Sequence, residues 1–456
     1  MDPLTQYLEQ HQDAFIDNLK SVLRIPSVST DPNHKADCAR CAEHVAQDLR
    51  RAGMTRAEVM KTDGHPVVYA EWLGAPGKPT VLLYGHYDVQ PPDPLELWHT
   101  PPFEPVLRDG KLYARGAVDD KGQVYMHINA IEAHMKVNGK LPVNLKVVIE
   151  GEEECGSDNL EKFLVESRAM LDADVIVVSD TAMLGPDQPA LTYALRGIMY
   201  TQINVQGPSQ DLHSGHFGGA VMNPANALCV IIAALKDGDG RITIPGFYES
   251  VVPLTPAERE QLRALPFNEA GFLAESGAPA PAGEKGYSTL ERTTARPTLD
   301  VNGIWGGYTG AGAKTVLPAK ASAKVSMRLV ANQDQDKLFP AYEAYVKRLA
   351  PAGVTVEVEH LHGGRPFLTD PNHPVLEKAR RALNRAWTKP AAMIREGGSI
   401  PVMATFQKTH GLPAILMGFG LDDDNVHAPN EKFSLSSYFG GTKSAAYLYE
   451  ELAKDA

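Results

Sequence analysis

The chain has 456 residues, more than a single domain usually contains, so two domains are expected. Hydrophobic residues make up 43% and charged residues 22%, a balance typical of folded globular proteins and not of disordered chains. The formal net charge of -12 argues against a broad basic surface for nucleic acid or anionic lipid. We therefore expect neither nucleic acid nor a membrane as a partner, which leaves small polar substrates.

Two features of the sequence predict where the protein is located. The first residues, MDPLTQYLEQHQDAF, contain no basic segment followed by an apolar core, and no apolar run of about twenty residues occurs elsewhere. We therefore expect neither export nor membrane insertion. The four cysteines are too few for a disulfide scaffold in a chain of this length. Together these features predict a cytoplasmic protein.

The first part of the chain alternates predicted helices and strands. Apolar residues at three and four spacing predict amphipathic helices over residues 3–24 and 36–52, and residues 121–139 also have a helical pattern. Short apolar, β-branched runs predict buried strands, and these are VVYAEW, TVLLYG, NLKVVIEG, DVIVVSD and, far downstream, PAILMGFG. This alternation predicts an α/β fold with a mostly parallel sheet sandwiched between helices.

The pattern changes near Arg196. The runs TQINVQG, KVSMRLV and VTVEVEH alternate in polarity around helical segments, which predicts an α+β domain inserted into the first. After about residue 367 the α/β pattern returns. We therefore predict one domain formed by residues 1–195 and 367–456, and an inserted domain formed by residues 196–366.

Acidic and histidine residues follow several of the predicted strands. TVLLYG leads into His86 and Asp88, NLKVVIEG into the three glutamates 152–154, and DVIVVS into Asp180. Because the carboxyl ends of parallel strands line one crevice, we expect these side chains to converge. Clustered carboxylates repel one another unless a cation balances them, and a divalent metal is the commonest such cation. The sequence therefore predicts a metal site.

Two further segments add possible ligands. Asp119 or Asp120 opens the predicted helix at 121–139, and HAPNE supplies His427 just past PAILMGFG. Imidazoles mixed with carboxylates suit zinc, manganese or cobalt, and the number of ligands fits two metals better than one. Each motif alone is more simply explained as a helix cap, a solvated face or a polar loop. Their joint position at successive strand ends favours the metal site.

The motifs and their order resemble a known family. GHYDVQP, ARGAVDDKG, EGEEECGS, VVSD, DLHSGHFGG, AKTVLP, MRLV, REGGSIP and HAPNE are similar to the carnosinase branch of the co-catalytic dizinc metallopeptidases. That family also includes carboxypeptidases, aminoacylases, acetylornithine deacetylase and succinyl-diaminopimelate desuccinylase. The resemblance covers nearly the whole chain and implies a catalytic α/β domain with an inserted lid and dimerisation domain.

The resemblance also implies a ligand set for two divalent metal ions, zinc in the first place and manganese or cobalt as alternatives. It places His86 and Asp180 on one metal, Glu154 and His427 on the other, and Asp119 between both.

Further roles follow from the same resemblance. Asp88 would orient His86, and Glu153 would be the general base that takes a proton from the attacking water. Three glutamates are consecutive, so a shift of the alignment by one residue would make Glu152 the base. The Gly-Ser pair that follows favours Glu153.

Residues of the inserted domain, together with Ser399 of the first domain, would complete the site. The resemblance implies that His213 stabilises the oxyanion in the neighbouring subunit's site, which requires a homodimer, with His216 as a rival. Arg328 would bind the substrate carboxylate, and Thr315 and Ser399 would contact the substrate.

The sequence therefore predicts a dinuclear metal-dependent hydrolase that cleaves the amide bond of dipeptides with a free C-terminal carboxylate. The alternatives are an N-acyl amino acid deacylase or desuccinylase, since the same metals and base would hydrolyse an acyl amide, and a non-catalytic metabolite-binding homologue.

Overall fold

The computed structural model describes residues 2–398 and 400–455. Contacts divide the chain into two compact units. Unit 1 comprises residues 1–193, 369–394 and 405–456, and unit 2 comprises residues 194–368 and 395–404. These limits lie close to the predicted domain boundaries, except that residues 395–404 group with unit 2.

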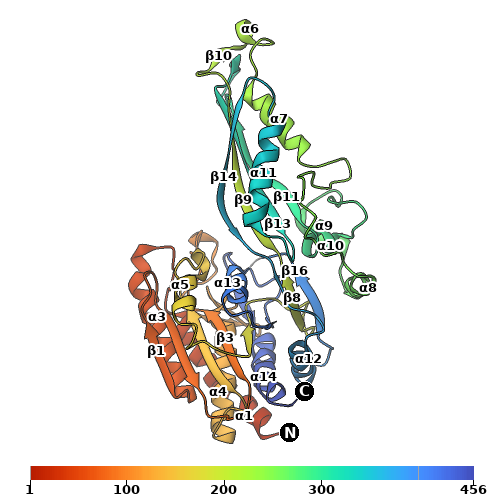
Figure 1. Ribbon diagram of the computed structural model, residues 1–456. Coiled ribbons are helices and arrows are strands. Elements are labelled where there is room, and N and C mark those ends of the chain that lie inside the picture. The colour runs from red at the N-terminus through yellow and green to blue at the C-terminus, as the bar shows by residue number, and fades with distance from the viewer. Residues whose placement is uncertain (1, 399, 456) are drawn as a thin grey trace. The chain divides into compact units, whose positions relative to one another are not determined.

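Unit 1 contains the large sheet (Figure 1). Its strands run in the order β1 (Arg56–Met60), β2 (Val67–Trp72), β6 (Asn144–Glu150), β3 (Thr80–His86), β7 (Val175–Val178), β17 (Ala414–Leu416) and β8 (Ala190–Leu195). β6, β3, β7 and β17 are parallel to one another, and the outer strands pair antiparallel. The predicted α/β fold with a mostly parallel central sheet is therefore confirmed. β15 (Phe367–Leu368) and β16 (Ala392–Glu396) pair with β8 at its edge.

The central strands are covered on both faces. A Cβ added at Gly85 in β3 would meet Val124 of α4 (Lys121–Asn138) at 2.6 Å, so this face packs closely against α4. The ring of Tyr84, the preceding residue, contacts Phe406 of α13 (Pro401–Thr409) on the other face. Strands buried on both faces need apolar residues at every position, which explains the continuous apolar runs in the sequence.

The remaining helices of unit 1 pack around α4 and the sheet. They are α1 (Pro3–Gln10), α2 (Gln12–Leu23), α3 (Lys35–Ala52), α5 (Leu160–Glu166), α12 (Pro374–Ala386) and α14 (Leu435–Leu452). A small sheet of β4 (Val106–Arg108), β5 (Lys111–Tyr113) and β18 (Lys432–Ser434) brings the segment before α4 beside the segment after β17. In the described part of the chain, no helix is long and apolar enough to span a bilayer.

Unit 2 is built on an antiparallel sheet with the order β11 (Thr298–Gly306), β13 (Lys320–Leu329), β9 (Gly197–Gln206) and β14 (Thr355–Gly364). Alternate residues of β9 are buried, and α7 (Pro224–Ala234) and α11 (Gln335–Leu349) pack on that face (Figure 1). The alternating polarity of these strands in the sequence reflects this single covered face. Three short helices, α8 (Pro256–Ala264), α9 (Glu269–Ser276) and α10 (Thr289–Thr294), form the segment before β11.

Candidate metal centre

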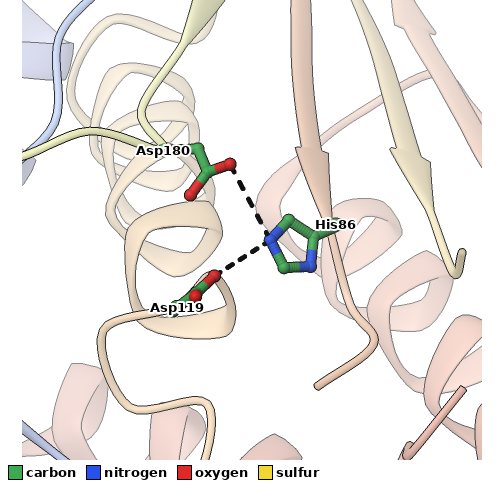
Figure 2. Close-up of side chains that lie close together, drawn as sticks. All are labelled: His86, Asp119 and Asp180. Atoms are coloured by element: carbon green, nitrogen blue, oxygen red, sulfur yellow. Dashed lines mark ion pairs between the residues drawn. The ribbon is translucent and has the colours of Figure 1, made fainter. Parts of the chain in front are cut away.

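The first group of predicted ligands comes from three segments of unit 1. His86 is the last residue of β3, Asp180 follows β7, and Asp119 lies just before α4. The His86 Nε2 atom faces both carboxylates, at 3.1 Å from Asp119 Oδ1 and 3.9 Å from Asp180 Oδ2 (Figure 2). The His86 side chain is fully buried, yet Nε2 makes no hydrogen bond. A buried nitrogen that faces two carboxylates without a hydrogen bond suits a bound cation.

The second group shares one residue with the first. His427 Nε2 lies 2.9 Å from Asp119 Oδ2 and 3.1 Å from Glu154 Oε2. In each group the three ligand atoms lie within 4.8 Å of one another. Asp119 therefore directs one oxygen toward each group, and the arrangement can hold two cations with this carboxylate between them.

The electrostatics of the centre indicate a need for positive charge. Burial and neighbouring carboxylates raise the pKa of Asp180 far above its usual range. Burial also acts on Asp119, but the hydrogen bond from His427 and the nearby His86 imidazole outweigh it and lower the pKa of Asp119. Hydrogen bonds to Asp119 and Glu154 raise the pKa of His427 to about 10. Carboxylates this close remain ionised together only beside a cation, which a divalent metal would supply.

The structure separates the two adjacent aspartates before α4. The side chain of Asp119 is 14% exposed and faces the two imidazoles. Asp120 is buried, and its Oδ2 accepts a hydrogen bond from the backbone N–H of His86 at 3.1 Å. Of this pair, Asp119 alone belongs to both ligand groups.

Asp88 lies behind the His86 imidazole. The His86 Nδ1 atom is 3.1 Å from the backbone oxygen of Asp88 and 3.4 Å from its Oδ1. The same carboxylate accepts hydrogen bonds from the backbone N–H groups of Glu153, at 3.3 Å, and Glu154, at 3.1 Å. Asp88 therefore contacts His86 of the first group and the turn that carries Glu154 of the second group.

The three consecutive glutamates have different surroundings. Glu152 is buried, and its carboxylate accepts hydrogen bonds from the His65 backbone N–H and the Asn159 side-chain amide. Glu153 begins the short helix η3 (Glu153–Cys155), and burial raises its pKa to about 7, with the Glu154 carboxylate adding to the shift. A carboxylate with this pKa suits proton transfer near neutral pH, whereas Glu152 is held by other partners. This supports Glu153 as the predicted base.

Within unit 2, the structure brings His213 and Thr315 together. His213 ends β10 (Leu212–His213), which pairs with β12 (Val316–Leu317), and the Ser214 N–H donates to the Thr315 backbone oxygen at 3.1 Å. His213 and Thr315 are both exposed. The rings of His213 and His216 are 4.8 Å apart, so the two predicted rivals share one surface.

Arg328 lies elsewhere in unit 2. It stands near the end of β13 and lines a cavity of about 490 Å³ together with Arg196. Burial lowers the pKa of both guanidinium groups. The charge of Arg328 lowers the pKa of Arg196 further, and the Asp300 carboxylate opposes the shift in both. The cavity could receive an anionic group such as a carboxylate. The predicted substrate contact Ser399 lies outside the described residues.

Sequence reasoning did not single out Glu431 as a functional residue. It is fully buried, and its carboxylate accepts hydrogen bonds from the backbone of the segment that carries Asp119. The available signal was its position in HAPNE, the motif that supplies His427.

Comparisons with known proteins agree with this geometry. The model of the peptidase family M20/M25/M40 matches residues 82–451. The Cys-Gly metallodipeptidase DUG1 of Candida albicans is 36% identical, with 98% of this chain and 97% of the relative covered. The human Beta-Ala-His dipeptidase is 33% identical, with 100% and 93% covered. The solved structure of the dipeptidase Dug1p from Saccharomyces cerevisiae has a TM-score of 0.81 at 32% identity, with 100% and 99% covered. The chain therefore belongs to the peptidase family M20/M25/M40.

Proposed function

We propose that this protein is a metal-dependent dipeptidase that cleaves the amide bond of dipeptides with a free C-terminal carboxylate. The observation that carries the proposal is the pair of three-residue ligand groups that share Asp119. The names of two relatives, a Cys-Gly metallodipeptidase and a Beta-Ala-His dipeptidase, support small dipeptides as the substrate class.

Two divalent cations fit the donors present. His86 and Asp180 would hold one, Glu154 and His427 the other, and Asp119 would contact both. Mixed imidazole and carboxylate donors favour zinc, with manganese or cobalt as alternatives. Bound there, the ions would lower the pKa of a water and polarise the scissile carbonyl.

Glu153 has the properties required for the proton transfers. It would accept the proton of the attacking water and later donate it to the leaving amine. Burial of its carboxylate raises its pKa, which favours a group that can take up a proton and give it back. Asp88 would keep the His86 imidazole and the Glu153 turn in place through the contacts described above.

Residues of unit 2, together with Ser399, would recognise the substrate. Arg328 would bind the terminal carboxylate, and Thr315 and Ser399 would contact the rest of the substrate. His213 would donate to the developing oxyanion in the site of a neighbouring subunit. This role requires a homodimer. β11 supports a homodimer because it is an edge strand of its sheet, open to pairing with another chain, and exposes the apolar side chains of Ile304 and Trp305.

We also propose that the protein is located in the cytoplasm. All four cysteines are free, as expected in a reducing compartment.

A panel of substrates tests the proposed function. Protein stripped of metal would be assayed against Cys-Gly, β-Ala-His and N-acetyl amino acids, before and after addition of zinc or manganese. We expect metal-dependent release of free amino acids from the dipeptides, and none from Glu153→Gln, which keeps the shape of the side chain but cannot take a proton.

Two outcomes would contradict the proposal. Cleavage of only the acetylated compounds would assign the protein to the deacylases. Metal binding without cleavage of either panel would favour a non-catalytic binding protein.

A further inference from the structure

The Glu431 carboxylate joins the two segments that carry His427 and Asp119. Its Oε1 accepts backbone hydrogen bonds from Val118 at 3.0 Å and from Asp119 itself at 3.2 Å. Its Oε2 accepts a third from Gly116 at 3.0 Å. Both oxygens therefore receive N–H donors from the same short loop, which fixes the loop relative to the HAPNE segment.

Arg115 completes the contacts of this carboxylate. Its Nη1 donates to Glu431 Oε2 at 2.7 Å, and both side chains are 1% exposed. Its Nη2 donates to the backbone oxygen of Pro91 at 3.2 Å, and its guanidinium lies over the Trp98 ring. A buried charge needs an opposite charge and hydrogen bonds, and Arg115 supplies both while it connects the segment after β3 to the same loop.

The loop has little room to move. Gly116 has a φ of 81°, which favours glycine, and an added Cβ would meet Val89 at 2.7 Å. The Ala114 N–H donates to the backbone oxygen of Glu431 at 3.1 Å, which extends the pairing of β5 with β18. Strand pairing and the buried carboxylate therefore hold both ends of the loop.

Asp88 makes a comparable set of contacts on the other side of the centre. It accepts hydrogen bonds from the backbone N–H groups of Glu153 and Glu154. Glu431 does the same for the loop that ends in Asp119. The turns that carry Glu154 and Asp119 are thus each held by a buried carboxylate that is not itself in either ligand group.

We propose that Glu431, held by Arg115, is a positioning residue that sets the affinity of the centre for metal. It would do so by fixing Asp119, the ligand common to both groups, relative to His427. The inference rests on the proposed function in so far as the two ligand groups bind metal. Partners of this kind typically change metal affinity by about 10- to 100-fold when they are removed.

Metal affinity is the measurement that tests this role. Zinc affinity and stoichiometry would be determined by competition with a chelating dye, on folded full-length protein, for wild type and Glu431→Gln. The variant keeps the size of the side chain but turns an NH₂ group toward N–H donors. We expect two zinc ions per wild-type chain and about 10- to 100-fold weaker binding in Glu431→Gln.

Glu451→Gln is the matched control. Glu451 is also buried and also pairs with arginines, Arg381 and Arg385, but it belongs to neither ligand group and contacts no ligand loop. We expect Glu451→Gln to lower thermal stability and to leave zinc affinity unchanged. Equal loss of affinity in both variants would overturn the proposal, because it would then reflect general destabilisation.

A second variant keeps the proposal testable if Glu431→Gln does not fold. Arg115→Lys keeps the positive charge but loses the paired donors, and we expect zinc affinity between those of wild type and Glu431→Gln. If Glu431→Gln does not fold, wild-type affinity in Arg115→Lys would overturn the proposal. If Glu431→Gln folds, wild-type zinc affinity in Glu431→Gln would overturn the proposal. Absence of zinc binding in the wild type would contradict the proposed function instead, so the two failures are distinguishable.

Discussion

The metal centre of unit 1 and the proposed substrate residues of unit 2 differ in how firmly the chain holds them. His86 ends β3 and Asp119 lies just before α4, and buried carboxylates accept hydrogen bonds from the backbone N–H groups of Asp119 and Glu154. His213 and Thr315 of unit 2 are exposed; His213 ends a two-residue strand, and Thr315 directly precedes the two-residue strand that pairs with it. The difference indicates that one chain brings the two candidate ligand groups together, whereas the proposed role of His213 depends on a neighbouring subunit.

The largest effect is expected from the ligand that both groups share. Asp119→Ala should remove both cations and reduce kcat/KM by about 10⁴-fold, since metal stabilisation of the transition state is worth several kcal/mol. Metal analysis by mass spectrometry and a dipeptide assay would measure this. A variant that retained two metals would show that Asp119 is not shared between the two ligand groups.

A smaller loss of activity is expected from the base. Glu153→Gln should retain both metals and lose about 10³-fold in kcat, because proton transfer is lost while the ligand groups are intact. Zinc stoichiometry and steady-state kinetics on the same sample would separate the two effects. Loss of metal in this variant would make Glu153 a ligand and contradict its assignment.

The histidines of unit 2 are the next test. His213→Ala should lower kcat by about 100-fold through loss of an oxyanion donor, with zinc affinity unchanged. His216→Ala, on the same surface, serves as the control and should leave kcat unchanged. Mixed dimers of His213→Ala and Glu153→Gln subunits should regain part of the activity if His213 acts in the neighbouring subunit, since one site is then complete. No recovery would limit His213 to its own subunit.

The smallest expected effect is a change with pH in the thermal stability of the metal-free protein. Glu153 has its pKa raised to about 7 in the fold, so between its ordinary value and 7 the folded state binds more protons than the unfolded state, and stability falls as pH rises. His427, raised to about 10, acts in the same direction above its ordinary value of 6.5.

Metal-free protein should therefore melt lower at pH 8 than at pH 6.5, by on the order of 2 °C. The zinc-loaded protein should show a weaker dependence, because the cations replace the protons as the balancing charge. Differential scanning calorimetry of both forms would measure this. Equal pH dependence of the two forms would indicate that the cations do not bind at these carboxylates.

Local sequence patterns were sufficient to predict the kind of fold and the candidate ligands. Continuous apolar, β-branched runs such as VVYAEW predict strands buried on both faces, and β2 covers the same six residues. His86 and Asp180 follow such runs, and parallel strands bring their carboxyl ends to one edge of a sheet. These inferences depend on local patterns, which the chain carries whatever its packing.

Only the tertiary structure distinguishes adjacent residues of the same type. Asp119 and Asp120 are identical in type, and packing turns Asp120 against the His86 backbone while Asp119 faces the imidazoles. The role of Glu431 depends on hydrogen bonds to residues more than three hundred positions earlier in the chain, for example Val118 at a separation of 313. No local pattern carries such a contact, because it arises when β18 pairs with β5 and closes the loop onto the buried carboxylate.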